Sequence, residues 1–292
     1  METIDQALIE GMCPVRDRGG HKGTFGTALI VAGSEFMSGA QTLAVSSALR
    51  SGTGMVRVFA PAGSMGSTIV NCPCALLSAW GDTETSTLRM LTGYLEKASA
   101  CGIGPGLDEK DKRSLAVLEY LIENSPKLVI DAGALNILSR NRERLFPLLS
   151  SRKGKPSFEP AILTPHIGEF KRLAGDCSEE VLVQFARDTG CITVLKSNNT
   201  IVSTEDGKCY INNVSNNGLA KGGSGDVLTG MITGFLAQGM NVAESALAGV
   251  YIHSLCGQLL ADRYGRRAML PSDMPDIMSS AFRACGWENN EN

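Results

Sequence analysis

The stretch Gly218–Gly239, GLAKGGSGDVLTGMITGFLAQG, places the strongest constraint on how this chain folds. Glycines at positions 222, 223 and 225 lead directly into Asp226, and apolar residues with helical spacing follow from Val227 onward. A glycine turn that runs into a helix leaves the first backbone N–H groups unpaired, all pointing one way at the positive end of the helix dipole. The sequence therefore predicts an anion-binding site, of the kind that holds phosphate, at the start of this helix.

Asp226 is unexpected at a place that attracts phosphate, and two interpretations of it stay open. As an N-cap, its carboxylate would accept a hydrogen bond from the second or third N–H of the helix. As a catalytic base, it would act on a hydroxyl held next to the phosphate, as carboxylates do in phosphoryl transfer. Three glycines in four positions give more conformational freedom than a cap requires, which favours the base.

Composition describes an ordinary globular protein of 292 residues, with 43% hydrophobic and 20% charged residues. The net charge of −3 gives no whole-chain field that attracts nucleic acid or an acidic membrane, so local donors must hold any anionic ligand. No signal peptide opens the chain, and no apolar run approaches the ~20 residues of a membrane span. The nine cysteines are scattered, and Cys72 and Cys74 are too close for usual zinc spacing, so we expect free thiols in a reducing cytoplasm.

Strand and helix patterns alternate along the chain without a linker or a repeat, after twenty residues with no regular pattern. The alternation predicts one domain, residues 1–292, of the α/β class: a three-layer αβα fold with a mainly parallel central sheet. Ligands of such sheets bind at the carboxyl ends of the strands, where we also place every glycine turn. We expect strands at residues 27–33, 55–61, 75–80, 127–135, 161–166 and 191–196, a strand leading to the Gly-Ile-Gly-Pro-Gly turn at 102–106, a hairpin around Asp206-Gly207, helices at residues 40–49, 85–97, 109–124, 141–150, 178–190 and 243–262, and a last helix capped by Ser272.

Three polar residues stand where predicted strands or apolar strand runs end, at that same edge. Lys196 could contact a phosphate, or it could be an exposed lysine at a strand end. His166 could bind a ligand, or it could be an ordinary loop histidine. Asp131 could lie near a metal or a phosphate, or it could cap the turn that follows it. His21 lies in a predicted loop and His253 on an apolar helix, where a buried histidine with satisfied hydrogen bonds is the commoner outcome.

Several ordered blocks resemble the NAD(P)H-hydrate dehydratases, relatives of the ribokinase-like carbohydrate kinases. The blocks are HKGTFGTALIVAGSEFMSGA, GIGPG, VIDAGALNIL, LTPHIGEF, LK with a five-residue loop, LAKGGSGDVLTG and MLPSDM. The resemblance implies a ribokinase-like fold and repair of the S-epimer of hydrated NADH or NADPH. In the family a nucleotide phosphorylates the ring hydroxyl, and loss of phosphate restores the double bond. The chain has no room for the epimerase domain that is fused in many bacterial members.

The family's functional residues carry over by position. Standalone members use ADP and yield AMP, members that prefer ATP are mainly eukaryotic, and we expect Mg²⁺ to offset charge. Assembly as a homo-oligomer, often a tetramer, is implied as well. The implied substrate-binding residues are Ala40, Gly104, His166 and Asp226, with Asp226 as the base, and the implied nucleotide-binding residues are Lys196, Ser197, Asn198, Asn199, Thr200 and Gly225.

Two departures from the family pattern stand out. Members commonly have Lys-Gly-Ala where this chain has Lys196-Ser197-Asn198, and Gly133 replaces the second acid of an Asp-Ala-Asp-Ala-Leu-Asn motif. A side chain at position 197 restricts a backbone that should fold closely around phosphate. Nucleotide binding by this loop is therefore a test of the resemblance to the family. Another kinase of the fold, for a hydroxyethylthiazole or a sugar, is one alternative, and a nucleotide-sensing module without turnover is another.

We expect the predicted residues to form two subsites. His166 and Gly104 should shape the dinucleotide site, because they follow strands other than the one that ends at Lys196. ADP or ATP should bind across Lys196–Thr200 and Gly225, with its terminal phosphate near Asp226.

Overall fold

The central element is one ten-stranded sheet, seen in a computed structural model that describes residues 1–289. Its strand order is β1-β10-β9-β8-β7-β6-β5-β2-β3-β4, and only the pairs β8–β9 and β9–β10 are antiparallel. This confirms the mainly parallel sheet and the hairpin around Asp206-Gly207. The strands are β1 (Glu2–Thr3), β2 (Thr27–Val31), β3 (Met55–Ala60), β4 (Leu76–Ala79), β5 (Ala100–Ile103), β6 (Leu128–Ile130), β7 (Ile162–Leu163), β8 (Ile192–Leu195), β9 (Ile201–Ser203) and β10 (Cys209–Ile211).

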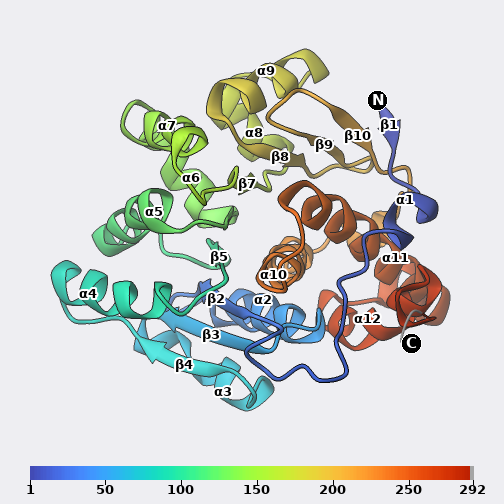
Figure 1. The fold of residues 1–292 in the computed structure, drawn as a ribbon, viewed down its shortest axis with the longest axis horizontal. Coiled ribbons are helices and arrows are strands. Elements are labelled where there is room, and N and C mark those ends of the chain that lie inside the picture. The colour runs from blue at the N-terminus through green and yellow to red at the C-terminus, as the bar shows by residue number, and fades with distance from the viewer. Residues whose placement is uncertain (290–292) are drawn as a thin grey trace.

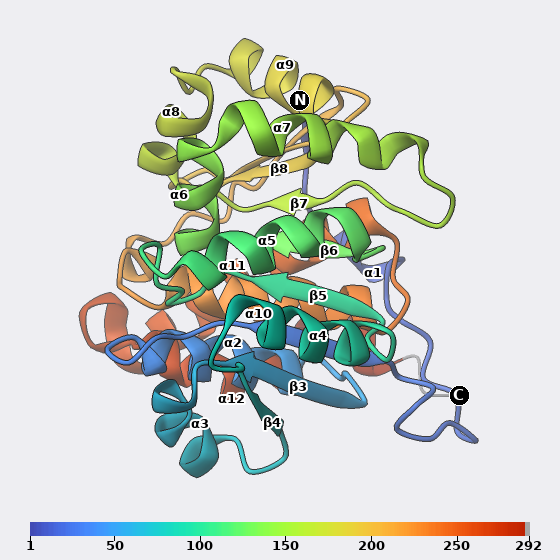
Figure 2. The ribbon, with the colours of Figure 1, turned by 90° about the vertical axis from the view of Figure 1, so that its left-hand side faces the viewer.

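Helices cover both faces of the sheet, as the three-layer prediction requires (Figure 1). One face carries α1 to α3 and α10 to α12, and Figure 2 looks onto the other face, which α4 to α9 cover. The helices are α1 (Gln6–Glu10), α2 (Ser38–Arg50), α3 (Gly66–Asn71), α4 (Glu84–Leu95), α5 (Lys112–Asn124), α6 (Ala132–Arg140), α7 (Arg142–Ser151), α8 (Ile167–Ala174), α9 (Glu179–Thr189), α10 (Ser224–Ala237), α11 (Val242–Ala268) and α12 (Met274–Ala284). None of the described helices is long and apolar enough to cross a membrane.

A separate apolar core fills each side of the sheet, because the parallel strands are buried on both faces. Alternate residues of β2 show the division: Ala28 and Ile30 pack toward α2 and α10, while Leu29 and Val31 pack toward α4 and α5. This period of two follows from the pleat of the strand. The two cores hold the strand ends of the central sheet in fixed register.

Helices α2 and α10 pack unusually closely. A Cβ added at Gly230 of α10 would lie 2.0 Å from the carbonyl oxygen of Ala44 in α2. A Cβ added at Gly234, one turn later, would lie 1.8 Å from Ser51 Oγ. The Ser47 hydroxyl donates across the same seam to the carbonyl oxygen of Val227 at 2.8 Å. The seam fixes the first turns of α10 relative to the second half of α2.

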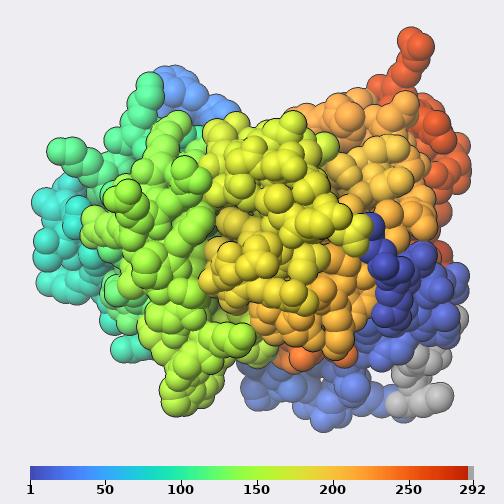
Figure 3. All heavy atoms as spheres, turned by 90° about the horizontal axis from the view of Figure 1, so that it is seen from above, coloured from blue at the N-terminus to red at the C-terminus, as the bar shows by residue number. Residues whose placement is uncertain are grey.

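The first residues of the chain are part of the fold, although their sequence shows no regular pattern. Strand β1 pairs with β10 in parallel, so the N-terminus lies against residues from near position 210 (Figure 3). Ile4 and Ile9 are fully buried and belong to the core beside α10 and α11. Strand β1 thus extends the sheet at the edge opposite β4.

Several predicted boundaries are wrong. The strand predicted over residues 127–135 ends at Ile130, because Ala132 has φ 46° and begins α6. Regular pairing within residues 161–166 is limited to β7, with a single bridge from His166 to Lys196 beyond it. The last helix has Asp273 as its N-cap rather than Ser272, because a 3-10 turn over Pro271–Asp273 precedes it.

The glycine turn before α10 also differs from its prediction. It does not directly follow a strand, because β10 ends at Ile211 and residues 212–223 intervene. That segment returns the chain to the edge where β6, β7 and β8 end, and the turn joins the predicted site from there.

Candidate active site

The first turn of α10 presents two backbone donors that no described group accepts. The N-cap is Gly223, with φ 101°, and no side chain caps the helix. The N–H groups of Gly225 and Asp226 therefore have no acceptor among residues 1–289. Free donors at the positive end of a fourteen-residue helix make the anion site that the glycine turn predicts.

Asp226 is not the N-cap, so the capping interpretation is wrong. It is the third residue of α10, and no hydrogen bond or ion pair within residues 1–289 reaches its half-buried carboxylate. Burial, and to a lesser degree the nearby carboxylate of Asp131, raise the pKa of Asp226 to about 7, while Lys196 opposes the shift. A carboxyl with a pKa near neutrality can accept and return a proton at physiological pH.

Lys196 and Asp131 form a shielded ion pair at the ends of β8 and β6. The Lys196 ammonium lies 2.7 Å from Asp131 Oδ1, and Asp131 is only 1% exposed. The other carboxylate oxygen accepts the hydroxyl proton of Thr229 at 2.7 Å. Lys196 is therefore not an exposed lysine at a strand end, and Asp131 does not cap the turn after it. Both of these alternatives are therefore wrong, because β6 and β8 end at the same edge of the sheet, on either side of β7.

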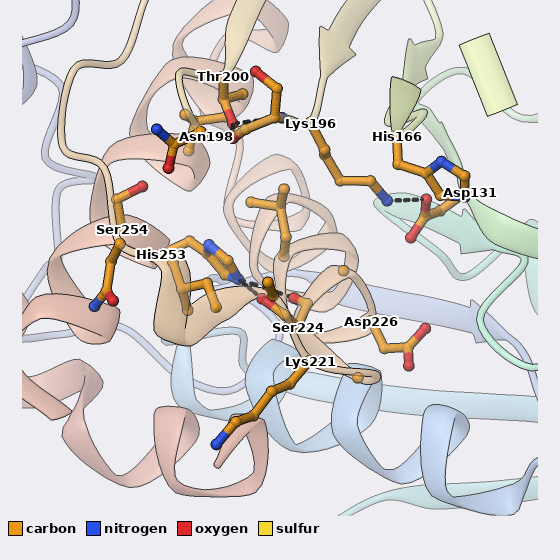
Figure 4. Close-up of a pocket in the computed structure, with 18 of the residues that line it drawn as sticks. Asp131, His166, Lys196, Asn198, Thr200, Lys221, Ser224, Asp226, His253 and Ser254 are labelled. Carbon is orange, nitrogen blue, oxygen red and sulfur yellow. Dashed lines mark hydrogen bonds and ion pairs between the residues drawn. The ribbon is translucent and has the colours of Figure 1, made fainter. Parts of the chain in front are cut away.

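Gly225 lets this ion pair approach the helix. A Cβ added at Gly225 would lie 3.0 Å from Lys196 Nζ and 3.6 Å from Asp131 Oδ2. The ammonium thus faces the same edge as the free N–H groups, as predicted. These groups border a cavity of about 620 Å³ (Figure 4).

His166 stands at the start of α8, beside Lys196 in space although thirty residues before it in sequence. Its Nδ1 accepts hydrogen bonds from the N–H groups of Gly168 and Glu169 at 2.9 and 3.2 Å. In return, the Glu169 carboxylate accepts from the His166 N–H at 2.8 Å, which completes a capping box. The histidine side chain is 55% exposed. Its ring therefore caps a helix and still faces the cavity.

The loop Lys196–Thr200 is braced by its own side chains. The Ser197 hydroxyl donates to the carbonyl oxygen of Asn199 at 2.7 Å, and the Thr200 hydroxyl donates to the Ser197 carbonyl oxygen at 3.2 Å. Asn198 Oδ1 accepts the Ser215 hydroxyl at 2.6 Å, which ties the loop to the segment after β10. The residues that depart from the family pattern thus stiffen a loop that glycine would leave free.

The cavity gathers most of the predicted site residues, but not all of them. Ala40, Gly104 and Asn199 are not among the residues that line it. Gly104 lies directly behind the cavity wall, because a Cβ at Gly104 would be 1.8 Å from the carbonyl oxygen of Asp131. Ala40 packs against the same turn, 3.0 Å from where a Cβ of Gly106 would be. The predicted residues that line the cavity are His166, Lys196, Ser197, Asn198, Thr200, Gly225 and Asp226.

Sequence reasoning did not single out three groups that shape this end of the cavity. Glu169 is buried and orients His166, and its place three residues after His166 is the signal that a capping box offers. Thr229 follows Asp226 by one helical turn and orients Asp131. The left-handed conformation of Ala132 has no signal in the sequence.

Away from the ion pair of Lys196 and Asp131, both polar and apolar side chains line the cavity. His253 of α11 lines it, and this histidine is 8% exposed with Nε2 2.9 Å from the carbonyl oxygen of Ser224. The prediction that His253 is buried and hydrogen-bonded is therefore confirmed. The structure adds that His253 lines the cavity. His21, the other weak candidate, is exposed and is not among the residues that line this cavity. The apolar lining consists of Val214, Leu219, Ala220, Leu228 and Val250.

Comparison with known proteins identifies the family. Residues 28–280 match the family model described as NAD(P)H-hydrate dehydratase. The ADP-dependent (S)-NAD(P)H-hydrate dehydratase of Bacillus subtilis is 33% identical over 282 residues, which cover 94% of this chain and 95% of that protein. The bifunctional NAD(P)H-hydrate repair enzyme Nnr of Moorella thermoacetica is 33% identical over 292 residues, which cover 96% of this chain and 53% of that protein. The chain thus spans about half the length of the bifunctional relative.

Comparison with solved structures agrees with the sequence match. A crystal structure of the ADP/ATP-dependent NAD(P)H-hydrate dehydratase from B. subtilis, co-crystallized with ATP/Mg²⁺, superposes with a TM-score of 0.81 at 28% identity. The superposition covers 97% of this chain and 98% of that one. Because the family model covers most of the chain, and the glycine-led helix with its unpartnered carboxylate lies inside the match, this chain belongs to the NAD(P)H-hydrate dehydratase family.

Proposed function

We propose that the protein dehydrates the S-epimer of hydrated NADH or NADPH and converts ADP to AMP and phosphate. The observation that carries the proposal is the Asp226 carboxylate, which has no partner among the described residues and stands beside the free N–H groups of α10. The name of the Bacillus subtilis relative, an ADP-dependent dehydratase, supports ADP as the donor. The family match favours this lyase over another small-molecule kinase of the fold.

The proposed chemistry uses Asp226 as the base. Asp226 removes the proton of the ring hydroxyl, the hydroxyl oxygen attacks the terminal phosphorus of ADP, and AMP departs. The carbon–oxygen bond to the new phosphate ester then breaks, and phosphate departs with that electron pair. Loss of a proton from the neighbouring ring carbon supplies the electron pair that restores the carbon–carbon double bond. The proton on Asp226 leaves with the phosphate products, so a pKa of about 7 suits both transfers.

The nucleotide phosphates belong, in this proposal, between Lys196–Thr200 and Gly225. Lys196 would share its ammonium between Asp131 and a phosphate, because an ammonium has three donors and the ion pair uses one. Gly225 would add its free N–H from the helix start. The braced loop supports a fixed cradle rather than one that closes around the ligand.

The hydrated dinucleotide belongs beside Asp226 on the other side, toward His166, Gly104 and Ala40. His166 lines the cavity, and the turn that holds Gly104 packs against Ala40 behind Asp131. The backbone bridge between His166 and Lys196 would place this subsite directly beside the nucleotide phosphates.

A Mg²⁺ ion fits this donor set, provided that the phosphates supply most of its ligands. No three His, Cys, Asp or Glu side chains within residues 1–289 form a metal-binding group. Mg²⁺ usually binds through one or two carboxylates together with substrate phosphates. The Glu169 carboxylate lines the cavity and would help the phosphates to hold the ion there. When bound, the ion would offset charge on the transferred phosphoryl group.

Assembly and compartment extend the proposal. We propose a homo-oligomer, in the form of a tetramer, because Ile69, Val70 and Leu76 are exposed apolar residues at or near the edge strand β4. Light scattering of the purified protein tests this. We propose the cytoplasm as the compartment, because all nine cysteines are free thiols and several are buried. Residues 1–292 would act as one domain.

Incubation with hydrated NADH and either ADP or ATP tests the function. The expected result is recovery of dihydronicotinamide absorbance with stoichiometric AMP from ADP. Phosphorylation of a small alcohol such as hydroxyethylthiazole, without recovery of the absorbance, would assign the protein to another kinase activity. Nucleotide binding with no turnover of either substrate would favour a sensing module.

A further inference from the structure

Two carboxylates at this site compete for a single lysine. The charges that act on Asp226 come from the ends of β6 and β8 and from α8, and they belong to Asp131, Lys196 and Glu169. The Lys196 ammonium bonds to Asp131 at 2.7 Å, and no ion pair within residues 1–289 joins it to Asp226 (Figure 4). A bond from Lys196 to Asp226 would favour the charged carboxylate and weaken it as a proton acceptor. Whatever holds the lysine on Asp131 therefore affects the reaction.

The other ionisable groups that line the cavity have partners of their own. His166 Nδ1 accepts two backbone N–H groups of α8. Lys221 donates to the carbonyl oxygens of Arg267 and Met269 at the end of α11. Burial lowers the pKa of His253 to about 4, so its ring is neutral at physiological pH. The competition is therefore between Asp131 and Asp226.

Thr229 makes the second bond to Asp131. It lies one helical turn after Asp226 in α10, is only 1% exposed, and donates its hydroxyl proton to Asp131 Oδ2 at 2.7 Å. A threonine hydroxyl inside a helix commonly donates to the carbonyl oxygen four residues earlier. Thr233 does so, with its hydroxyl 2.7 Å from the carbonyl oxygen of Thr229. Thr229 instead gives its proton to a carboxylate 98 positions away.

These two bonds decide where the protons of Lys196 point. Each oxygen of the Asp131 carboxylate accepts one bond, and no further donor within residues 1–289 reaches it. Because Asp131 is 1% exposed, an oxygen without a donor would carry uncompensated charge in a buried place. The flexible ammonium of Lys196 would then move to serve both oxygens. With Thr229 on Oδ2, one ammonium proton satisfies Oδ1 and two remain for another acceptor.

The oxygen that Thr229 serves is also the one nearest to the helix start. Asp131 Oδ2 lies 3.6 Å from the place of a Cβ on Gly225, beside the free N–H groups of α10. Negative charge at this point would repel a phosphate and would oppose loss of the proton from Asp226. A hydroxyl donor offsets part of that charge.

We propose that Thr229 is a positioning residue of the reaction. Its hydroxyl fixes Asp131 so that Lys196 bonds to one oxygen alone, which keeps two ammonium protons for the nucleotide phosphate and leaves Asp226 free as the base. This inference rests on the proposed function, because it assigns a role in the same reaction to a residue that does not line the cavity.

Thr229→Val tests the role, because valine has nearly the same shape and no hydroxyl. Lys196 should then turn toward both oxygens of Asp131, and the KM for ADP should rise about tenfold, in line with loss of a hydrogen bond to a charged group. The charge of Asp131 should act more strongly on Asp226, so the pH of half-maximal turnover should rise by about half a unit or more. About two pH units above the new midpoint, kcat should return to within about threefold of the wild type, since the base is deprotonated there.

Three further variants separate this role from support of the fold. Thr229→Ser keeps the hydroxyl, so it should restore the pH profile and the KM for ADP, even if the lost methyl group lowers the melting temperature. Thr233→Val is the matched control, because its hydroxyl bonds only within α10, and it should leave both quantities unchanged. Asp131→Asn removes the competing charge and releases Lys196 toward Asp226, so its midpoint should move to lower pH, opposite to Thr229→Val.

Calorimetry with ADP distinguishes failure of this inference from failure of the proposed function. A loss of turnover in Thr229→Val that is equal at every pH, with unchanged affinity for ADP, would overturn the inference while the function stands. Failure of Thr229→Ser to restore both quantities would overturn it too, since the methyl group would then matter rather than the hydroxyl. If the wild type does not turn over hydrated NADH, the function fails. Weaker ADP binding in Thr229→Val that Thr229→Ser restores would still support the hold of Thr229 on Lys196, and equal binding by all three proteins would refute it.

Discussion

The two glycine turns of this site look alike in sequence and meet different physical demands. Gly104 in the turn after β5 has φ 128°, and a Cβ there would lie 1.8 Å from a backbone carbonyl oxygen of Asp131. Gly225 in the turn before α10 has ordinary helical geometry, and its nearest obstacle is the Lys196 ammonium at 3.0 Å. One glycine allows two backbone segments to meet. The other allows a charged side chain to reach a helix start.

This difference separates stability from chemistry. A backbone segment cannot move aside, so the first turn is part of the fold itself. A lysine side chain can move, at the cost of its contact with Asp131, so the second turn affects the ligand site alone. Substitutions in the two turns should therefore have different effects: loss of stability at Gly104 and loss of ligand binding at Gly225.

The largest effect is expected at Asp226, which tests whether the α10 turn serves chemistry. Asp226→Asn keeps the size of the side chain and removes the proton acceptor, so turnover should fall ~10²–10⁴-fold. The melting temperature should not fall, because the carboxylate has no described hydrogen bond to lose. Steady-state kinetics and thermal melts measure both quantities, with Asp262→Asn on the exposed side of α11 as the matched control. A variant that unfolds but stays active per folded molecule would contradict the assignment.

Gly104→Ala should produce the largest loss of stability. The positive φ and the contact with the Asp131 carbonyl oxygen together should cost about 3 kcal/mol or more. Since about 1 kcal/mol shifts Tm by roughly 2 °C or more in a chain of this size, Tm should fall by ~6 °C or more. Gly93→Ala in α4, where no atom lies within 4 Å, is the matched control. It should raise stability by up to about 1 kcal/mol, because alanine is the better helix former.

The pKa of Asp226 predicts opposite effects of pH on rate and on stability. A base must be deprotonated, so turnover should rise with pH and reach half its maximum near pH 7. The folded pKa lies above the ordinary value for a carboxyl, so the folded protein binds more protons than the unfolded chain from about pH 4 to about pH 7. The free energy of unfolding should therefore decrease as pH rises through that window. Asp226→Asn should remove this component, and unchanged pH profiles in the variant would refute it.

Gly225→Ala should have a smaller effect and should act on the nucleotide. The new methyl group would displace the Lys196 ammonium from the helix start, and ADP affinity should fall about tenfold, or ~1.4 kcal/mol. Stability should stay close to that of the wild type. Gly222→Ala, with no atom within 4 Å of the added Cβ, should change affinity by about twofold at most. Equal losses at both positions would mean that backbone freedom, rather than access for Lys196, matters in this turn.

Ser197→Gly should have the smallest effect. The Ser197 hydroxyl closes the loop onto Asn199, so glycine restores backbone freedom and removes this brace. The two changes oppose each other, and nucleotide affinity should change by less than about tenfold. If the wild type shows no ADP or ATP binding at millimolar concentration in calorimetry, the loop is degenerate and the kinase-type chemistry is wrong for this chain.

Local patterns in the sequence predicted most of the fold. Ser178 caps α9 as expected, and the helix that follows the glycine turn begins at Ser224, within the predicted stretch. These features depend on neighbours along the chain, so the sequence contains them. The end of β6 was missed, because the left-handed conformation of Ala132 is imposed by packing at the strand edge and not by its own residue type.

The site was predicted only as separate pieces. Glycine turns and strand ends indicated which residues face the ligand edge, but the pairing of Lys196 with Asp131 joins residues 65 positions apart. Nor does a spacing rule reveal that Asp226 lacks a partner, since its freedom results from Thr229 and Lys196 bonding to Asp131 instead. Chemical roles that arise from such competition for partners become visible only in three dimensions.

The seam between α2 and α10 has a consequence for synthesis of the chain. Ser47 of α2 bonds to a residue 180 positions later, and a ribosome adds ~5–20 residues per second, so α2 waits roughly 10–40 s for its partner. During that interval the nascent chain exposes the apolar side of α2 that α10 later covers, and chaperones bind such surfaces. A chain released from a ribosome that stalls before residue 224 would lack both α10 and the Asp226 carboxylate. Its apolar core would stay uncovered, so proteases could degrade the chain before it aggregates.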